Sequence, residues 1–293
     1  MFASLVPQLD SLVLVGLFTL CAGSWGLIWG RLARGAPMVP WRDRPRIEWP
    51  GILPLVAFPL VYIVSVWIHH LAIRHKDPPD LLQSLQVDCL SRLVCWGALL
   101  VFPLAFRQWN RENLGLHRGP IGPEIALGLG TACAVFLPVM AINFAVAAGG
   151  WKDPEVVHPL LQALKSGDTR IWPWVALSAV VLAPLLEELQ YRVFVQGTLE
   201  DRVGLSGWTS INLSSLLFCG VHFAPGRPDG LALFPLAFAL GFLYWRRRSY
   251  IAVVVAHATF NGTRYLTGTA RSTSDRYIKS LASVSGTARA GCG

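Results

Sequence analysis

Charge is scarce in this sequence of 293 residues. Only 14% of its residues are Asp, Glu, Lys or Arg, whereas 53% are hydrophobic, and a typical soluble domain carries about 25% charged residues. The mean hydropathy is accordingly high, at +0.48. This scarcity excludes an ordinary soluble domain and indicates an integral membrane protein, which we expect in the cell (inner) membrane.

Several familiar cysteine and histidine patterns are absent. The six cysteines show no CxxC spacing and lie mostly in apolar segments, which argues against both a disulfide framework and a zinc ribbon. There is no HExxH motif, which argues against zinc peptidases that carry it. The first ten residues contain no Lys or Arg, so we expect the first apolar segment to be a retained helix rather than a signal peptide.

The net charge of +8 does not indicate a nucleic-acid partner, because the basic residues are scattered among loops between apolar segments. Membrane topology explains this distribution better. The expected partners are membrane lipid and a peptide or protein substrate, with no nucleic acid.

Long apolar stretches dominate the chain and predict an all-α fold, a polytopic transmembrane helix bundle of about eight spans. A helix needs about 20 apolar residues to cross the hydrocarbon core. The third stretch is short, and it extends back over Asp88 and Arg92 if that side faces the bundle interior. The stretches cover roughly 11–30, 51–73, 93–106, 124–149, 172–195, 208–223, 230–245 and 250–266.

No internal repeat or soluble domain interrupts these stretches. The sequence predicts N-terminal transmembrane helices with loops over 1–171 and a core of four helices over 172–266 in the same membrane domain. Residues 267–293 are rich in Ser, Thr, Gly and Arg without a hydrophobic period, which predicts a disordered tail.

Two adjacent glutamates lie in the otherwise apolar fifth stretch, Glu187 and Glu188, and Arg192 follows them. Ionisable groups at such depth are costly, so they usually pair or serve a function. Glu188 and Arg192 have the i,i+4 spacing of a helical ion pair. Glu187 is rotated from Glu188 by about 100° and is expected to face a cavity. Pro184 is expected to bend the helix just before them.

The same i,i+4 spacing relates Phe218 to His222 and His257 to Asn261. Two histidines, a carboxylate and an amide that face one interior have the groups to deprotonate a water and stabilise an oxyanion, which indicates a hydrolase. Carboxylate and imidazole are also ligands of catalytic zinc. A Zn²⁺ site at Glu187, His222 and His257 therefore stands beside a metal-free site as an alternative.

These three motifs resemble the EExxxR, FxxxH and HxxxN motifs of the CPBP family, the CAAX protease or abortive-infection family that includes Rce1-like intramembrane peptidases. The motifs run from Glu187 to Arg192, from Phe218 to His222 and from His257 to Asn261, in the family's order. The resemblance covers about residues 172–266, and the preceding helices match only as membrane spans.

The resemblance implies an intramembrane endopeptidase, glutamate-dependent or zinc-dependent, that cleaves a membrane-associated substrate, prenylated at a CAAX terminus or unmodified. It implies that Glu187 and His222 activate the attacking water. His257 and Asn261 would stabilise the oxyanion or help to hold a metal, and Glu188 and Arg192 would support the site.

Other functions use some of the same residues. The segment from Gly204 to Gly207 resembles the serine motif of rhomboid peptidases, but that hypothesis leaves the two glutamates unexplained. A proton-relay transporter or a non-catalytic membrane scaffold would also retain buried Glu and His side chains. Convergence of Glu187, His222 and His257 on one pocket favours hydrolysis, whereas their spread along the membrane normal favours a relay.

Overall fold

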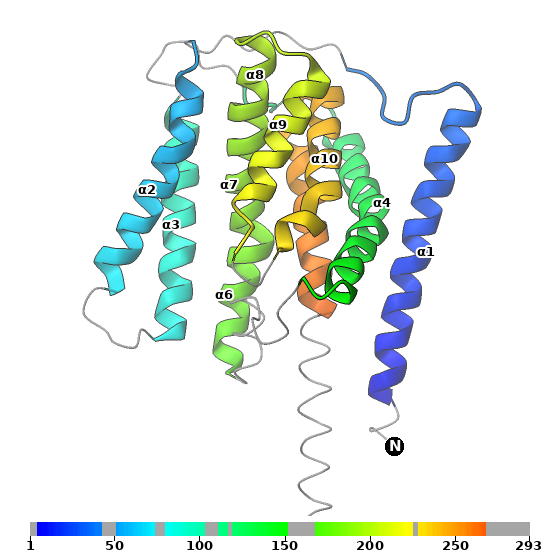
Figure 1. Cartoon of the computed structure of the whole chain (residues 1–293), viewed down its shortest axis with the longest axis horizontal. Coiled ribbons are helices and arrows are strands. Elements are labelled where there is room, and N and C mark those ends of the chain that lie inside the picture. The colour runs from blue at the N-terminus through cyan, green and yellow to red at the C-terminus, as the bar shows by residue number, and fades with distance from the viewer. Residues whose placement is uncertain are drawn as a thin grey trace, which may run out of the picture.

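A computed structural model describes residues 5–42, 51–73, 80–102, 111–116, 119–151, 168–224 and 228–267. Within these ranges the elements are all helices, arranged as a bundle (Figure 1). The all-α fold predicted from the hydrophobic pattern is therefore confirmed. The predicted tail lies outside the described residues except for Thr267.

Four long helices come first: α1 (Leu5–Ala33), α2 (Leu53–Ile73), α3 (Leu81–Val101) and α4 (Ile121–Ala148). A continuous helical rod follows from Thr169 to Asp201. Its consecutive parts are η3 (Thr169–Ile171), α6 (Trp172–Ala176), η4 (Leu177–Leu182), α7 (Ala183–Glu188), η5 (Leu189–Gln196) and α8 (Gly197–Asp201). The chain ends with α9 (Gly207–Gly220), α10 (Asp229–Arg247) and a last helix over 250–267.

Five helices in the described part of the chain are long and apolar enough to cross a membrane: α1, α2, α3, α4 and the rod. The expectation of about eight spans is thus supported only in part. The sixth expected span corresponds to α9, which has 14 residues and is shorter than the about 20 that a crossing requires. The third span extends back over Asp88 and Arg92, as the sequence pattern allowed, because α3 begins at Leu81.

The helices pack around α10, which contacts both α9 and α4. On one side α2 and α3 pair with each other and reach the rod, while α1 contacts α4 on the other (Figure 1). Trp25 of α1 donates its indole N–H to the carbonyl of Ala134, at 2.9 Å. Large apolar side chains of α1 such as Leu27 and Trp29 remain exposed, as expected for a helix that faces lipid.

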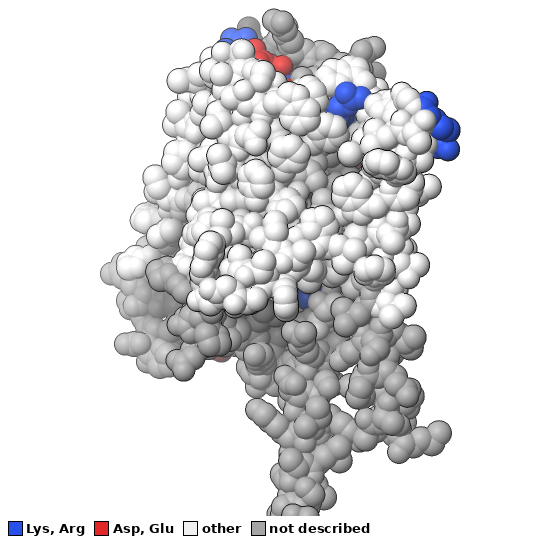
Figure 2. Space-filling model, turned by 45° about the vertical axis from the view of Figure 1, so that its right-hand side comes forward, with Lys and Arg blue, Asp and Glu red and all other residues white. Residues whose placement is uncertain are grey.

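The surface has the character of a membrane protein. In the view of Figure 2, charged side chains gather mostly near the upper end and leave a broad uncharged area below them. Arg247 of α10 and Arg42 form ion pairs with Glu124 of α4, at 2.5 and 3.3 Å. Arg42 is thereby linked through Glu124 to the end of α10.

The rod changes its helix type on both sides of Pro184. This proline lies in the first turn of α7, and the neighbouring segments η4 and η5 are both π-helical. A proline removes a backbone donor, and π-helical turns often occur at functional sites. The helix type therefore changes on both sides of Pro184, and the bend expected there stays a prediction.

Candidate active site

The two glutamates of the rod lie in different environments. Glu188 has no exposed surface and pairs with Arg192, one helical turn later, with 3.1 Å between Oε2 and Nε. Arg192 is equally buried, donates from Nη1 to Ser214 Oγ at 2.7 Å, and lies over the ring of Phe218. The expected ion pair is therefore formed, and α9 supplies a further acceptor for the arginine.

His257 joins the last helix to this pair. Its Nδ1 lies 2.8 Å from Glu188 Oε1, and its side chain is 4% exposed. Because a carboxylate accepts hydrogen bonds, Nδ1 carries the proton and the other ring nitrogen is directed elsewhere. That nitrogen, Nε2, lies 4.0 Å from Oε2 of Glu187.

Glu187 is the more accessible carboxylate, with 16% of its side chain exposed. Its Oε1 lies 3.6 Å from Nη1 of Arg92, a residue of α3. The neighbouring side chains of Arg92 and His257 are thus farther from this carboxylate than a direct hydrogen bond. In the part of the chain that the structure describes, neither of them occupies a carboxylate oxygen of Glu187.

Arg92 belongs to a polar chain that begins in η4. Ser178 donates to Asp88, and Oδ2 of Asp88 lies 2.8 Å from Nε of Arg92. The three family motifs contain none of these residues. One signal existed in the sequence, because Asp88 and Arg92 repeat within an apolar stretch the i,i+4 spacing of Glu188 and Arg192.

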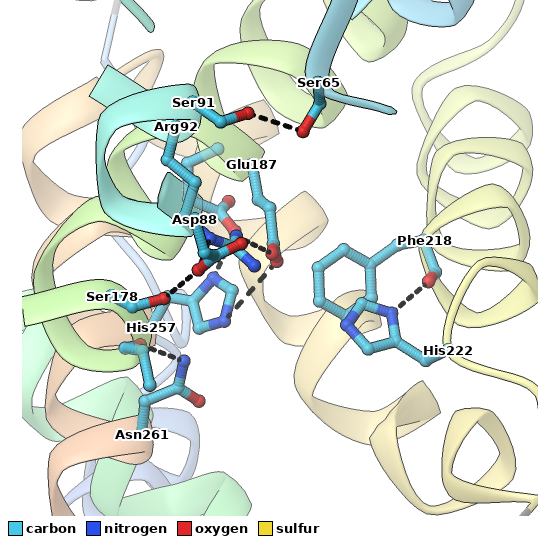
Figure 3. A network of polar contacts seen from close by, with 12 residues as sticks. Ser65, Asp88, Ser91, Arg92, Ser178, Glu187, Phe218, His222, His257 and Asn261 are labelled. Atoms are coloured by element: carbon cyan, nitrogen blue, oxygen red, sulfur yellow. Dashed lines mark hydrogen bonds and ion pairs between the residues drawn. The ribbon is translucent and has the colours of Figure 1, made fainter. Parts of the chain in front are cut away.

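Figure 3 shows Arg92, Glu187 and His257 gathered together, whereas His222 lies to one side. His222 follows the end of α9, and its Nδ1 contacts the carbonyl of Phe218 at 2.7 Å. The Phe218 ring packs against both histidines, with ring centroids 4.6 Å from His222 and 5.7 Å from His257. Among the described residues, no hydrogen bond or ion pair links His222 to Glu187.

Asn261 lies one turn after His257 but faces the rod. Its Nδ2 donates to the carbonyl of Ala179 in η4, at 2.8 Å. One amide hydrogen is therefore used to join the last helix to the π-helical segment. This hydrogen bond holds η4 against the last helix. The same amide nitrogen carries a second N–H.

The residues expected to bind zinc do not come together in this arrangement. A catalytic zinc is usually held by three protein ligands, and Glu187, His222 and His257 supply only one close pair. Among the described residues, no group of three His, Cys, Asp or Glu side chains is placed to hold a metal ion. Arg92 instead places a positive charge beside Glu187.

The serine of the rhomboid-like motif, Ser206, caps the start of a helix. Ser206 is the N-cap of α9, and its Oγ accepts from the backbone N–H of Thr209 at 3.1 Å. This is the usual contribution of serine at a helix start. It is exposed, and its contacts explain the motif without a nucleophile.

The three residues whose convergence would favour hydrolysis do not all meet, because His222 lies to one side (Figure 3). Glu187 and His257 face each other across 4.0 Å, and Glu188 and Arg192 support them from the buried side. A carboxylate and an imidazole at this separation can bind one water between them, since a contact longer than 3.5 Å is commonly bridged in this way.

Comparison with protein families agrees with the motifs. Residues 169–263 match the family described as type II CAAX prenyl endopeptidase Rce1-like, which confirms the predicted family. Comparison with curated proteins and with solved structures gave no match. With five helices suited to crossing a membrane, the chain is an integral membrane protein that carries a domain of a protease family.

Proposed function

We propose, from its Rce1-like domain, that this protein is an intramembrane peptidase that hydrolyses a peptide bond of a membrane-associated substrate. The observation that carries the proposal is the pair formed by Glu187 Oε2 and His257 Nε2, 4.0 Å apart. Both atoms can accept a hydrogen bond, so one water can donate to both and direct its oxygen lone pairs at a carbonyl carbon.

The steps of the proposed reaction are set by where the protons of the attacking water go. The water oxygen bonds to the carbonyl carbon while Glu187 takes one of its protons, and the carbonyl oxygen becomes an oxyanion. The C–N bond breaks as this proton passes to the leaving nitrogen, which gives a carboxylic acid and an amine. The hydrogen bond between His257 and Glu188 keeps the imidazole oriented throughout.

Asn261 remains the predicted donor to the oxyanion, and His222, which the family resemblance assigned to the water, is given the role of a second donor in this proposal. Asn261 has one amide hydrogen beyond the one given to Ala179. His222 is partly exposed at the end of α9, and a protonated imidazole at that position would donate from Nε2. Compared with the expectation from the family, the water is assigned here to Glu187 and His257, because His257 is the closer histidine.

The name of the matched family suggests a substrate with a prenylated cysteine near a free C-terminus. The test uses purified full-length protein in detergent and two quenched fluorescent peptides, one farnesylated and one not. Glu187→Gln keeps the size of the side chain but removes the base, so cleavage should fall by about 100-fold or more. Exposed Glu112 provides the control, Glu112→Gln, which should cleave normally.

Metal dependence is tested in the same assay. Activity that survives chelation and is lost in Glu187→Gln supports the metal-free proposal. Loss on chelation with recovery by zinc would instead support the zinc-dependent alternative, in which His222 must leave its contact with Phe218. Full cleavage by Glu187→Gln would contradict both assignments of the base, whereas no cleavage by the wild type would leave the transporter or scaffold hypotheses.

A further inference from the structure

Helix α3 lies outside the segment that matches the protease family, which spans residues 169–263, yet it supplies a charged group to the site. Arg92 Nη1 is 3.6 Å from Oε1 of Glu187. We propose that Arg92 is a positioning residue that orients the carboxylate of Glu187, and that Asp88 sets how strongly it does so. This inference rests on the proposed function.

The first argument is distance. At 3.6 Å the guanidinium attracts Glu187 without a direct hydrogen bond. A bidentate pair would engage both carboxylate oxygens and hold Oε2 away from its direction toward His257. The longer contact biases the orientation of Glu187 and leaves Oε2 directed at His257.

The second argument is the competing acceptor. Asp88 binds Nε of Arg92 at 2.8 Å, which is a charge-assisted hydrogen bond of normal length. Asp88 is itself held by Ser178 of η4, the segment just before the turn that carries Glu187. The guanidinium is therefore attached to Asp88 and only approaches Glu187 (Figure 3).

The third argument is charge. Glu187, Glu188 and Asp88 bring three carboxylates into one region, and Arg192 is already engaged with Glu188. Arg92 is the arginine placed beside Glu187, where its positive charge attracts that carboxylate from α3. Without Arg92, Glu187 would lose the charged group that orients it.

The expected result is a defect in the chemical step. Arg92→Gln should lower kcat by about 100-fold, the effect typical of a misplaced catalytic group, with KM unchanged within about twofold because substrate contacts remain. Arg92→Lys keeps the charge and should recover part of kcat. Asp88→Asn should also lower kcat, because the freed guanidinium can then bind Glu187 directly.

Folding is monitored separately by thermal unfolding in detergent. If Arg92→Gln unfolds, kcat and KM are measured instead on the double variant Asp88→Asn/Arg92→Gln, which removes both charges of the pair together. The matched control is Arg170→Gln at the start of the rod, where an exposed arginine pairs with Asp168 at 2.8 Å and no effect on kcat is expected.

The outcomes separate this inference from the proposed function. Cleavage by the wild type that is lost in Glu187→Gln, together with a wild-type kcat in Arg92→Gln, would overturn the role of Arg92 alone. An increase in KM without a change in kcat would do the same and would indicate a substrate contact. If the wild type cleaves neither peptide, the proposed function fails and this inference fails with it.

Discussion

Adjacent residues of one helix serve different purposes in this site. Glu188 has no exposed surface and contacts both Arg192 and His257, whereas Glu187 is 16% exposed and lies 3.6 Å from Arg92 and 4.0 Å from His257. The rotation of about 100° between successive residues separates the two carboxylates. One of them is consequently a structural anion, and the other is available for chemistry.

Arg192→Ala should destabilise the protein as well as inactivate it. The substitution leaves Glu188 buried beside His257 without its arginine, and removal of one partner from a buried ion pair typically costs about 3–5 kcal/mol. Folded yield and the thermal unfolding midpoint in detergent should both fall. Arg202→Ala, at an exposed position after α8, is the control and should behave like the wild type. Normal stability of Arg192→Ala would show that the pair does not retain these glutamates in the membrane.

Helix segments of unusual pitch determine how the site is presented. The rod is π-helical before α7 in η4 and after it in η5, so the backbone carbonyls in these segments are displaced from regular α-helical partners. Asn261 of the last helix donates to one of these carbonyls, that of Ala179. An amide of the HxxxN motif thus stabilises the segment that precedes Glu187.

Asn261→Leu tests this contact between elements. The variant keeps a similar volume but removes the donor to Ala179, and an unsatisfied buried acceptor costs about 1–3 kcal/mol. The midpoint of thermal unfolding should decrease. Thr263→Val is the matched control, because the hydroxyl of Thr263 bonds only within its own helix, to Thr259 at 2.9 Å. An equal midpoint for Asn261→Leu and the wild type would contradict the structural part of its role.

At the scale of the whole molecule, the matched protease segment is enclosed by helices from outside it. Helices α2 and α3 cover η5 and η4 of the rod, and α4 packs against α10. From α2, Tyr62 bonds through its hydroxyl to the hydroxyl of Tyr191, at 2.7 Å. The N-terminal helices therefore contribute side chains to the wall of the site as well as membrane anchorage.

Close contact between α4 and the last helix depends on Gly128. A Cβ atom at this position would lie 2.7 Å from the carbonyl oxygen of Ala252 and 2.9 Å from the side chain of Val255. Gly128→Ala should therefore destabilise the protein by about 1–3 kcal/mol, as overpacking usually does. Gly130→Ala, where nothing lies within 4 Å of the added atom, should not. Equal unfolding midpoints for the two variants would show that the helices separate easily at this point.

The amino-acid sequence by itself determined the features that arise within one helix. Apolar length predicted membrane helices, and the i,i+4 spacing predicted the ion pair of Glu188 with Arg192. The rotation between neighbours separated Glu187 from Glu188, and the order of the three motifs identified the family that residues 169–263 match. These inferences succeeded because helical geometry relates residues close in the sequence by known distances and angles.

Only the tertiary structure decided which helices face one another. The approach of Arg92 to Glu187 joins residues of α3 and the rod, and the sequence pattern of either helix contains no information on their mutual rotation. The position of His222 relative to Glu187 likewise depends on how α9 packs against the rod, although its contact with the Phe218 carbonyl is local. The expected zinc ligands do not meet for this reason, since three residues can share a motif order while the packing of their helices directs one of them away.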